Sequence, residues 1–161
     1  MLCGDDDLAV RHAHARRYPF LPFVVFPYED LFRTLRTHVL TDEPLVGSAP
    51  EDIPRLLQAL QQGHCFIASD GLCEASGTRF GSADGALLMG DESRFEGTVD
   101  LEVHLPAEAA FTVFQDGEPF INQRGTTCAF CAESPGVYRV EARRDNKPWI
   151  YTNPIYLRPG A

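Results

Sequence analysis

The chain has 161 residues, of which 44% are hydrophobic and 23% are charged, and its formal net charge is −9. That length suits one domain, or one domain with an appendage, and the apolar residues are sufficient for a core. A negative chain repels a phosphate backbone, so we expect no nucleic-acid partner. No apolar run reaches the roughly 18 residues of a membrane span, so we expect no membrane partner either.

The cysteines and the N-terminal sequence point to one compartment. The first ten residues, MLCGDDDLAV, lack the basic and then apolar pattern of a secretion signal. The chain has 5 cysteines, an odd number that does not suit a framework of paired disulfides. We therefore expect reduced thiols and a cytoplasmic location.

The stretch RHAHARR, residues 11–17, holds two histidines one residue apart, His12 and His14. On a strand, residues i and i+2 share a face, so both imidazoles can reach one metal ion. The same stretch also suits a basic surface patch with its three arginines. The following run of apolar residues, 20–26, is interrupted by Pro22. So many apolar side chains are unusual in a free tail, so we expect this segment to pack against another surface.

Two helices are predicted before residue 64. The first begins at Pro27 and carries Leu31, Leu35 and Val39 at intervals of four residues. The second has Asp52 as a cap, Pro54 in its first turn and Gly63 as its stop. Its apolar stripe consists of Ile53, Leu56, Leu57 and Leu60.

The remainder of the chain has the pattern of short strands. TVDLEVHLP, residues 98–106, alternates strictly between apolar and polar side chains, and Asp116-Gly117 is a strong hairpin signal. The other predicted strands are HCFIAS, ALLMG, AFTVF, EPFI, TTCAFCA, GVYRVEA, PWIYT and PIYLR. Short strands spaced by turn residues predict an antiparallel, immunoglobulin-like β-sandwich.

Tyr138 supports that fold class. It follows the Pro135-Gly136 turn near the start of a strand, with apolar Val140 two residues on. This is the arrangement of a tyrosine corner, in which the phenol bonds back to the backbone. Val140 is then expected to point inward.

Other chemically reactive residues have ordinary structural explanations. Cys128 and Cys131, in CAFC, lie in a β pattern, where residues three apart point to opposite faces. Asp70 and Asp91 adjoin glycines, so turn chemistry explains them. His38, His64 and His104 are expected in a helix, after a helix and on the polar face of a strand. The sequence contains no GxSxG, HExxH or glycine-rich phosphate loop.

Five stretches together resemble a known family: HAHARR, FPYEDLFRTLRTHVL, EDIPRLLQALQQGHCFIASDGL, FGSADGALLMGDES, and SPGVYRVEARR with PWIYTNPIYLR. They look like the C-terminal part of metal-dependent phosphoesterases of the PHP (polymerase and histidinol phosphatase) superfamily, in the branch that carries a sandwich after the barrel. The resemblance implies that residues 1–45 are the last part of a PHP barrel. Residues 46–161 would be a helix and an immunoglobulin-like accessory sandwich.

The resemblance also implies a metal role for the histidine pair. The last ligand motif of the family, Asp-x-His, aligns with His12-Ala13-His14, so His14 inherits a ligand role and His12 stands where the family has aspartate. The full-length enzymes use a divalent metal such as Zn, Mn or Fe to activate water. The other ligands have no counterpart in this chain, so we expect no tightly bound metal and no catalysis by this chain alone. The expected partner is a PHP barrel, in cis or in trans.

Two alternatives stay open. In the first, the chain is a β-sandwich binding module for a carbohydrate, peptide or protein. Trp149, Tyr151 and Tyr156 are its candidate platform, although alternation makes Trp149 and Tyr151 same-face residues that suit a core row equally well. In the second, an oligomer assembles a complete metal site between chains, and the apolar N-terminal segment suggests such a homo-oligomer.

Overall fold

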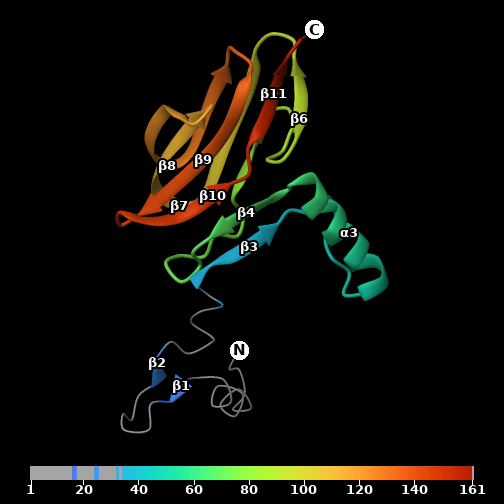
Figure 1. Cartoon of the computed structure of the whole chain (residues 1–161), viewed down its shortest axis with the longest axis vertical. Coiled ribbons are helices and arrows are strands. Elements are labelled where there is room, and N and C mark those ends of the chain that lie inside the picture. The colour runs from blue at the N-terminus through green and yellow to red at the C-terminus, as the bar shows by residue number, and fades with distance from the viewer. Residues whose placement is uncertain (1–15, 18–23, 26–31, 33, 161) are drawn as a thin grey trace.

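The computed structural model describes residues 16–17, 24–25, 32 and 34–160. These residues are mainly β, as predicted, and Figure 1 shows the strands from residue 36 onward gathered into one body with helix α3 (Ala49–Gln62) beside it. The strands are β1 (Arg16–Arg17), β2 (Val24–Val25), β3 (Arg36–Val39), β4 (Cys65–Ala68), β5 (Arg79–Ser82), β6 (Glu92–Phe95), β7 (Val99–Gln115), β8 (Glu118–Ala132), β9 (Gly136–Arg144), β10 (Lys147–Thr152) and β11 (Ile155–Pro159). No helix among the described residues has the length and apolar character needed to cross a membrane.

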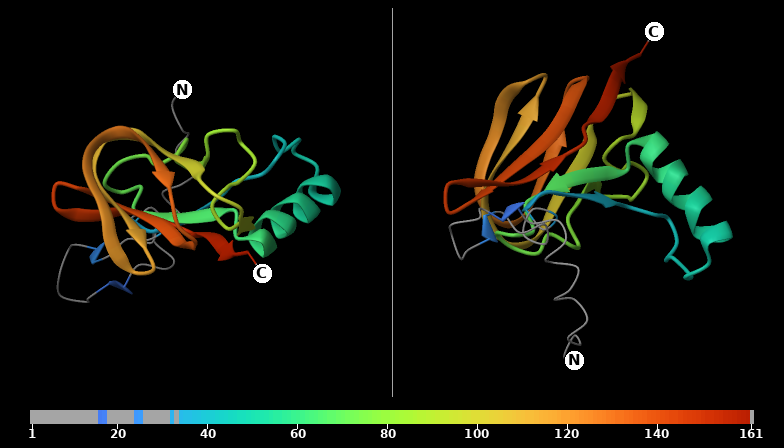
Figure 2. Two further views of the ribbon diagram at one scale, coloured as in Figure 1. Left: turned by 90° about the horizontal axis from the view of Figure 1, so that it is seen from above. Right: turned by 60° about the horizontal axis from the view of Figure 1, so that its bottom comes forward.

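Nine of these strands belong to one hydrogen-bonded sheet. Its main path runs β3-β4-β10-β9-β11-β6, while β7 joins through β9 and also pairs with β5 and β8. All pairs are antiparallel except β6 with β11, which is parallel. The expectation of a purely antiparallel arrangement is therefore wrong, and the sheet is open and mixed. Figure 2 shows the strands curled around a shared interior.

The long β7–β8 hairpin contributes to this curl. Residues 99–104 of β7 pair with the end of β8, whereas residues 109–115 pair with its beginning and also with β9. A register shift between His104 and Ala109 separates the two parts. An irregularity of this kind bends a strand, so one strand serves two differently oriented parts of the sheet.

Alternation along β7 is confirmed. Its inward side chains are buried: Leu101, Val103, Leu105, Ala109, Phe111 and Val113. Asp100 and His104 lie on the exposed side, as predicted. The hairpin is confirmed too, because Asp116 (φ 53°) and Gly117 (φ 89°) both take the left-handed backbone that a tight turn between twisted strands requires.

The tyrosine corner is confirmed. Tyr138 is fully buried, and its hydroxyl donates to the backbone oxygen of Ser134 at 2.8 Å. Val140 points into the core, as expected, and is fully buried. The contact spans only four residues, so the phenol closes the turn that leads into β9.

Two predicted elements are wrong, the first of them only in part, because Phe32 and Thr34 are helical as expected. Residues 36–39 form β3 rather than the end of a helix, so His38 lies on a strand. The reason is pairing with β4, which runs in register from Arg36 opposite Ala68 to Val39 opposite Cys65. ALLMG, residues 86–90, is a turn rather than a strand, and among the described residues its ladder contact is a single bridge between Leu88 and Gly81.

Helix α3 begins earlier than predicted. Its N-cap position is Ser48, so Asp52 is not the cap and Pro54 lies inside the helix rather than in its first turn. Asp52 instead accepts hydrogen bonds from the backbone N–H groups of Val46 and Gly47, at 2.9 and 2.8 Å. The stop is confirmed, since Gly63 is left-handed (φ 75°) and its N–H bonds to Ala59 and Leu60 oxygens.

The tyrosine corner generates an ordered series of stabilities. Tyr138→Phe keeps the ring but leaves the Ser134 oxygen without its donor, so we expect a loss of about 1–3 kcal/mol in the free energy of unfolding. Tyr138→Ala also opens a cavity, at about 3–5 kcal/mol. Glu141→Ala, on the outer side of β9, should cost less than about 1 kcal/mol, because its ion pair with Arg139 is partly exposed. Chemical denaturation measures the free energy of unfolding of all three variants. A large loss for Glu141→Ala together with no loss for Tyr138→Phe would show that the two faces of β9 are assigned the wrong way round.

Candidate functional site

The predicted metal ligands, His12 and His14, lie outside the described residues, so the structure does not place them. Within the described part of the chain, no three His, Cys, Asp or Glu side chains gather where they could hold a metal ion. The polar cluster that the structure does build centres on Asp70, in the turn after β4. It is the best-defined candidate site in residues 34–160.

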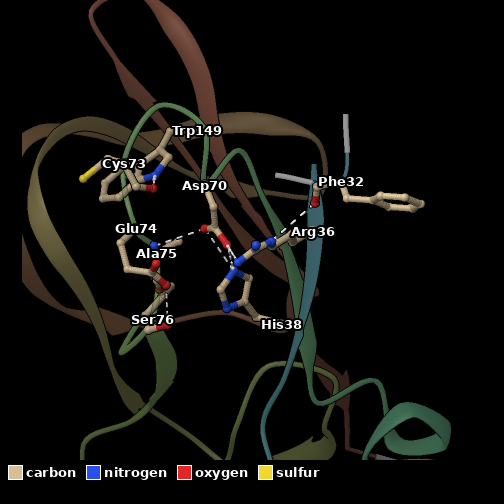
Figure 3. Close-up of polar contacts among 10 residues, drawn as sticks. Phe32, Arg36, His38, Asp70, Cys73, Glu74, Ala75, Ser76 and Trp149 are labelled. Carbon is tan, nitrogen blue, oxygen red and sulfur yellow. Dashed lines mark hydrogen bonds and ion pairs between the residues drawn. The ribbon is translucent and has the colours of Figure 1, made fainter. Parts of the chain in front are cut away.

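Asp70 receives hydrogen bonds from two elements. From β3, the His38 Nε2 lies 3.1 and 3.0 Å from its two carboxylate oxygens, and an Arg36 Nη donates at 3.3 Å. From its own loop, the N–H of Ala75 donates at 3.2 Å. Figure 3 shows the carboxylate between the β3 side chains and this loop. The Asp70 side chain is only 4% exposed. These hydrogen bonds therefore replace the water that an exposed carboxylate would bind.

His38 is oriented by two contacts. Its ring stacks on Phe66 with centroids 4.6 Å apart and planes 7° apart, and its Nε2 faces Asp70. A histidine held by a carboxylate through one nitrogen presents the other as a base, which is half of a general-base arrangement. Within the part of the chain that the structure describes, the side-chain hydrogen bonds of His38 all go to Asp70, and none joins it to a hydroxyl or thiol. The geometry thus supports anchoring of β3 rather than nucleophile activation.

The loop that follows Asp70 covers Trp149. The indole Nε1 donates to the backbone oxygen of Cys73 at 2.8 Å, and an Arg144 Nη lies 3.3 Å from the Cys73 sulfur. The Arg144 guanidinium also lies over the Trp149 ring, 5.8 Å from its centroid. Asp70 therefore holds, on one carboxylate, both the edge strand and the loop that closes the core over Trp149.

A second polar junction joins the end of α3 to the turn before β6. The His64 Nε2 lies 2.7 Å from an Asp91 oxygen, and the other Asp91 oxygen accepts from the Leu88 N–H at 2.7 Å. The Asn153 side chain donates to the backbone oxygen of Gly63 at 2.8 Å. Turn chemistry thus explains Asp91, as predicted. His64, after the helix, serves to join two turns.

Gly90 shows how tightly that junction packs. A Cβ added there would lie 2.4–2.5 Å from backbone atoms of Gln62 and Gly63, and its φ is 103°. Both the contact and the backbone conformation exclude a larger residue.

The CAFC cysteines occupy opposite faces of β8, as predicted. Cys128 is buried in the core, while Cys131 lies on the other face, opposite Asp100 of β7. Burial raises the pKa of the Cys128 thiol. The pKa of Cys131 is also raised, first by desolvation and then by its hydrogen bond to Asp100. Raised pKa values are the opposite of what a reactive thiolate requires.

The aromatic platform does not form from the three predicted residues. A register shift between Pro148 and Ile150 places Trp149 and Ile150 both in the core. Tyr151 is exposed on the outer side, so the prediction that Trp149 and Tyr151 share a face is wrong. Tyr156 is half-buried, with the Arg158 guanidinium 5.0 Å from its ring centroid.

A shallow recess of about 590 Å³ lies beside the β5–β6 connection. The Ser82 hydroxyl donates to Asp84 at 2.5 Å and accepts from the Leu87 N–H at 2.8 Å. The hydrogen bond from Ser82 lowers the pKa of Asp84. These contacts shape the turn itself.

The sequence did not reveal the Asp70 cluster, although it held a signal for it. RTHV has β-branched residues at alternate positions and places Arg36 and His38 two residues apart, so the two side chains share one face of a strand.

No family model, curated protein or solved structure matches this chain.

Removing the Asp70 carboxylate should destabilise the domain more than removing either partner. Asp70→Ala leaves a half-buried histidine and a backbone N–H unpaired, so we expect a loss of about 3–5 kcal/mol in the free energy of unfolding. Arg36→Ala should cost less than about 1 kcal/mol, because its side chain is 44% exposed. His38→Ala should fall between the two. Urea denaturation gives the ranking, and an Arg36→Ala loss equal to that of Asp70→Ala would contradict it.

Thiol labelling tests the assignment of the cysteine faces. Only the thiolate reacts with iodoacetamide, so the buried Cys128 should be the slower of the CAFC pair at pH 8 in the native protein. After denaturation without reductant, all 5 cysteines should label. Peptide mass spectrometry reads both states. A Cys128–Cys131 disulfide in freshly purified protein would show that the segment is not a strand.

Proposed function

We propose that this chain is the C-terminal accessory region of a PHP-superfamily metal-dependent phosphoesterase and is not catalytic on its own. The hydrolase activity would belong to a barrel supplied in cis or in trans. The β region would then position the last part of that barrel. The domain boundary at residues 45 and 46 is part of this proposal, as is the division of the curled sheet into an immunoglobulin-like sandwich.

The observation that carries the proposal is the pair of side-chain contacts by which Asp70 binds Arg36 and His38 of β3. This strand directly follows the N-terminal region that contains His12 and His14. Two of its four side chains bond to the Asp70 carboxylate in the turn after β4, and its backbone pairs with β4. A strand held in this way transmits the position of the preceding segment to the whole domain, which is what a supporting domain must do.

The stretches that carry the resemblance also contain residues that connect separate elements of the fold. RTHVL contains β3, and GDES contains Asp91, which bonds to His64. SPGVYRVEA contains the tyrosine corner. TNPIYL contains Asn153, which bonds to the end of α3. Residues that connect two elements tolerate fewer substitutions than residues on exposed strand faces. A resemblance concentrated at such residues therefore supports a shared architecture.

The described residues do not fit a metal site of their own. A catalytic metal needs three or more protein ligands and a shell that orients them. Near the Asp70 cluster, His38 already uses its Nε2 for Asp70, and Arg36 adds a positive charge that disfavours a cation. We therefore derive no catalytic step in residues 34–160, and a metal would enter only through His14 and His12 together with ligands from a barrel.

The second candidate is a binding module. It rests on the exposed Tyr151 of β10 and Ile67 of β4, which are register partners on the outer side of the sheet. Two adjacent exposed apolar side chains make a small contact surface. A Tyr151→Ala and Ile67→Ser pair that abolished capture of a polysaccharide or peptide would favour this reading over the accessory role.

Metal analysis tests the accessory proposal. We expect the purified chain to bind Zn²⁺ or Mn²⁺ with a dissociation constant above about 1 µM, because two histidines are too few ligands. It should also hydrolyse bis(p-nitrophenyl) phosphate no faster than buffer does. Elemental analysis after dialysis and a chromogenic assay give the two readouts.

The matched variants are His12→Ala/His14→Ala and, as a control, His104→Ala, which removes an exposed histidine from β7. Stoichiometric metal that survives dialysis and is lost in the double variant but not in the control would overturn the proposal. The same holds for hydrolysis that depends on the pair.

A further inference from the structure

A recess of about 490 Å³ lies between the β9–β10 turn and the bend in the β7–β8 hairpin. It forms around Ala109 and Ala110, which directly follow the register shift of β7. Because alanine side chains are short, they leave a hollow between the longer side chains of the flanking strands. The volume of the recess lies within the range of about 300–1,000 Å³ that small-molecule sites occupy.

Two arginines flank this hollow at one position of the sheet. Ala110 is the register partner of Arg124 on β8 and also of Arg143 on β9, and all three residues are exposed. Register partners point to the same face of a sheet, so both arginines stand beside Ala110 on its outer side. Neighbouring strands are about 4.8 Å apart, so the two arginine Cα atoms are separated by roughly 10 Å. Both guanidinium groups can therefore reach a ligand that lies over Ala110.

Each of these guanidinium groups retains donors for a ligand. Arg124 donates its Nε to a Glu108 oxygen at 2.8 Å, and Arg143 donates one Nη to the backbone oxygen of Asn146 at 3.2 Å. Among residues 34–160 these are the side-chain hydrogen bonds that the two arginines make. A guanidinium has five N–H groups, so most of them stay available on both sides of the recess.

The local charge favours an anion although the chain as a whole is negative. Three arginines, Arg124, Arg143 and Arg144, contribute to the lining, against two carboxylates, Glu108 and Asp145. The formal net charge of −9 belongs to the whole chain. Salt screens exposed charges that are more than about 8–10 Å away, so the local excess of positive charge decides which ions enter the recess.

We propose that this recess binds a phosphorylated small molecule by its phosphate group. Arg124 and Arg143 donate from opposite sides to the phosphate oxygens, over Ala110. A guanidinium matches the geometry of a phosphate with paired hydrogen bonds, and two guanidiniums balance the nearly two negative charges of a phosphomonoester. The recess is larger than a phosphate group, so the rest of the ligand lies along Ala109 and Asn146. This proposal does not depend on the relationship to phosphoesterases, and either can fail alone.

NMR titration of the isotope-labelled full chain with phenyl phosphate tests the proposal. We expect saturable binding with a dissociation constant of about 0.1–1 mM at low salt, because the two arginines are exposed to solvent. The largest shifts should belong to the backbone amides of Ala110, Arg124, Arg143 and Asn146. Benzoate keeps the ring but replaces the phosphate with a carboxylate of single charge, and it should bind at least about 5-fold more weakly.

Removing either flanking guanidinium should weaken the binding of phenyl phosphate. Arg124→Gln and Arg143→Gln should each raise the dissociation constant about 10-fold or more, because each removes charge-assisted hydrogen bonds to the phosphate. The matched control is Arg158→Gln. Arg158 pairs with Glu92 as Arg124 pairs with Glu108, but it lies on β11, so this variant should bind as the wild type does. Circular dichroism verifies that every variant is folded.

Asp145→Asn should change the affinity in the opposite direction. The hydrogen bond and charge of Glu108 raise the pKa of Arg124, and the charge of Asp145 adds to this effect, so Asp145 acts on the same guanidinium. Asp145 has a left-handed backbone (φ 49°), which asparagine also tolerates. Removing this negative charge from the edge of the recess should tighten the binding of phenyl phosphate by about 2- to 5-fold.

Three outcomes would overturn the proposal. The first is a titration that does not saturate by about 10 mM phenyl phosphate, or one whose shifts centre outside the recess. The second is equal binding of benzoate, which would exclude phosphate as the recognised group. The third is a loss of affinity in Arg158→Gln equal to that in Arg124→Gln, which would show that only the net charge of the chain matters.

Discussion

One buried carboxylate determines how the edge of this sheet is built. Asp70 is almost sealed from solvent, so leaving its charge unpaired would cost several kcal/mol. The structure pairs it from two sides, with His38 on β3 and with the loop N–H of Ala75. Because that loop also accepts the Trp149 indole N–H, the position of the edge strand is coupled to closure of the core. A four-residue strand at an open edge is otherwise weakly held.

Features encoded within a few residues were predictable from the sequence. The alternation of β7 fixes which side chains face the core, and the Asp116-Gly117 turn fixes the register of the hairpin that follows. The tyrosine corner spans only four residues, so its geometry is local as well. In each case the physical determinant lies within the segment itself, and the mainly β character of the chain follows from the sum of such segments.

Features that depend on distant partners were not predictable. The segment containing β3 has a helical spacing of leucines and valine, and only its pairing with β4, after an intervening helix, selects the strand. The shift at Pro148 turns Trp149 into the core, which strict alternation cannot anticipate. The candidate site is of the same kind, because His38 and Asp70 are 32 residues apart. Each of them alone resembles an ordinary surface residue, and only the fold makes them a pair.

The orientation of α3 differs from what its sequence pattern usually indicates. The helix forms where its apolar stripe predicted one, but Ile53, Leu57 and Leu60 of that stripe are exposed. An amphipathic helix ordinarily turns its apolar stripe to the core. Here Asp52 fastens the preceding loop to one side of the helix through two backbone N–H groups, and that side becomes the buried one. Ile53 follows Asp52 by one residue, about 100° around the helix axis, and so faces outward. The residue that resembles a cap in the sequence thus holds the preceding loop to the helix, while Ile53, Leu57 and Leu60 stay exposed.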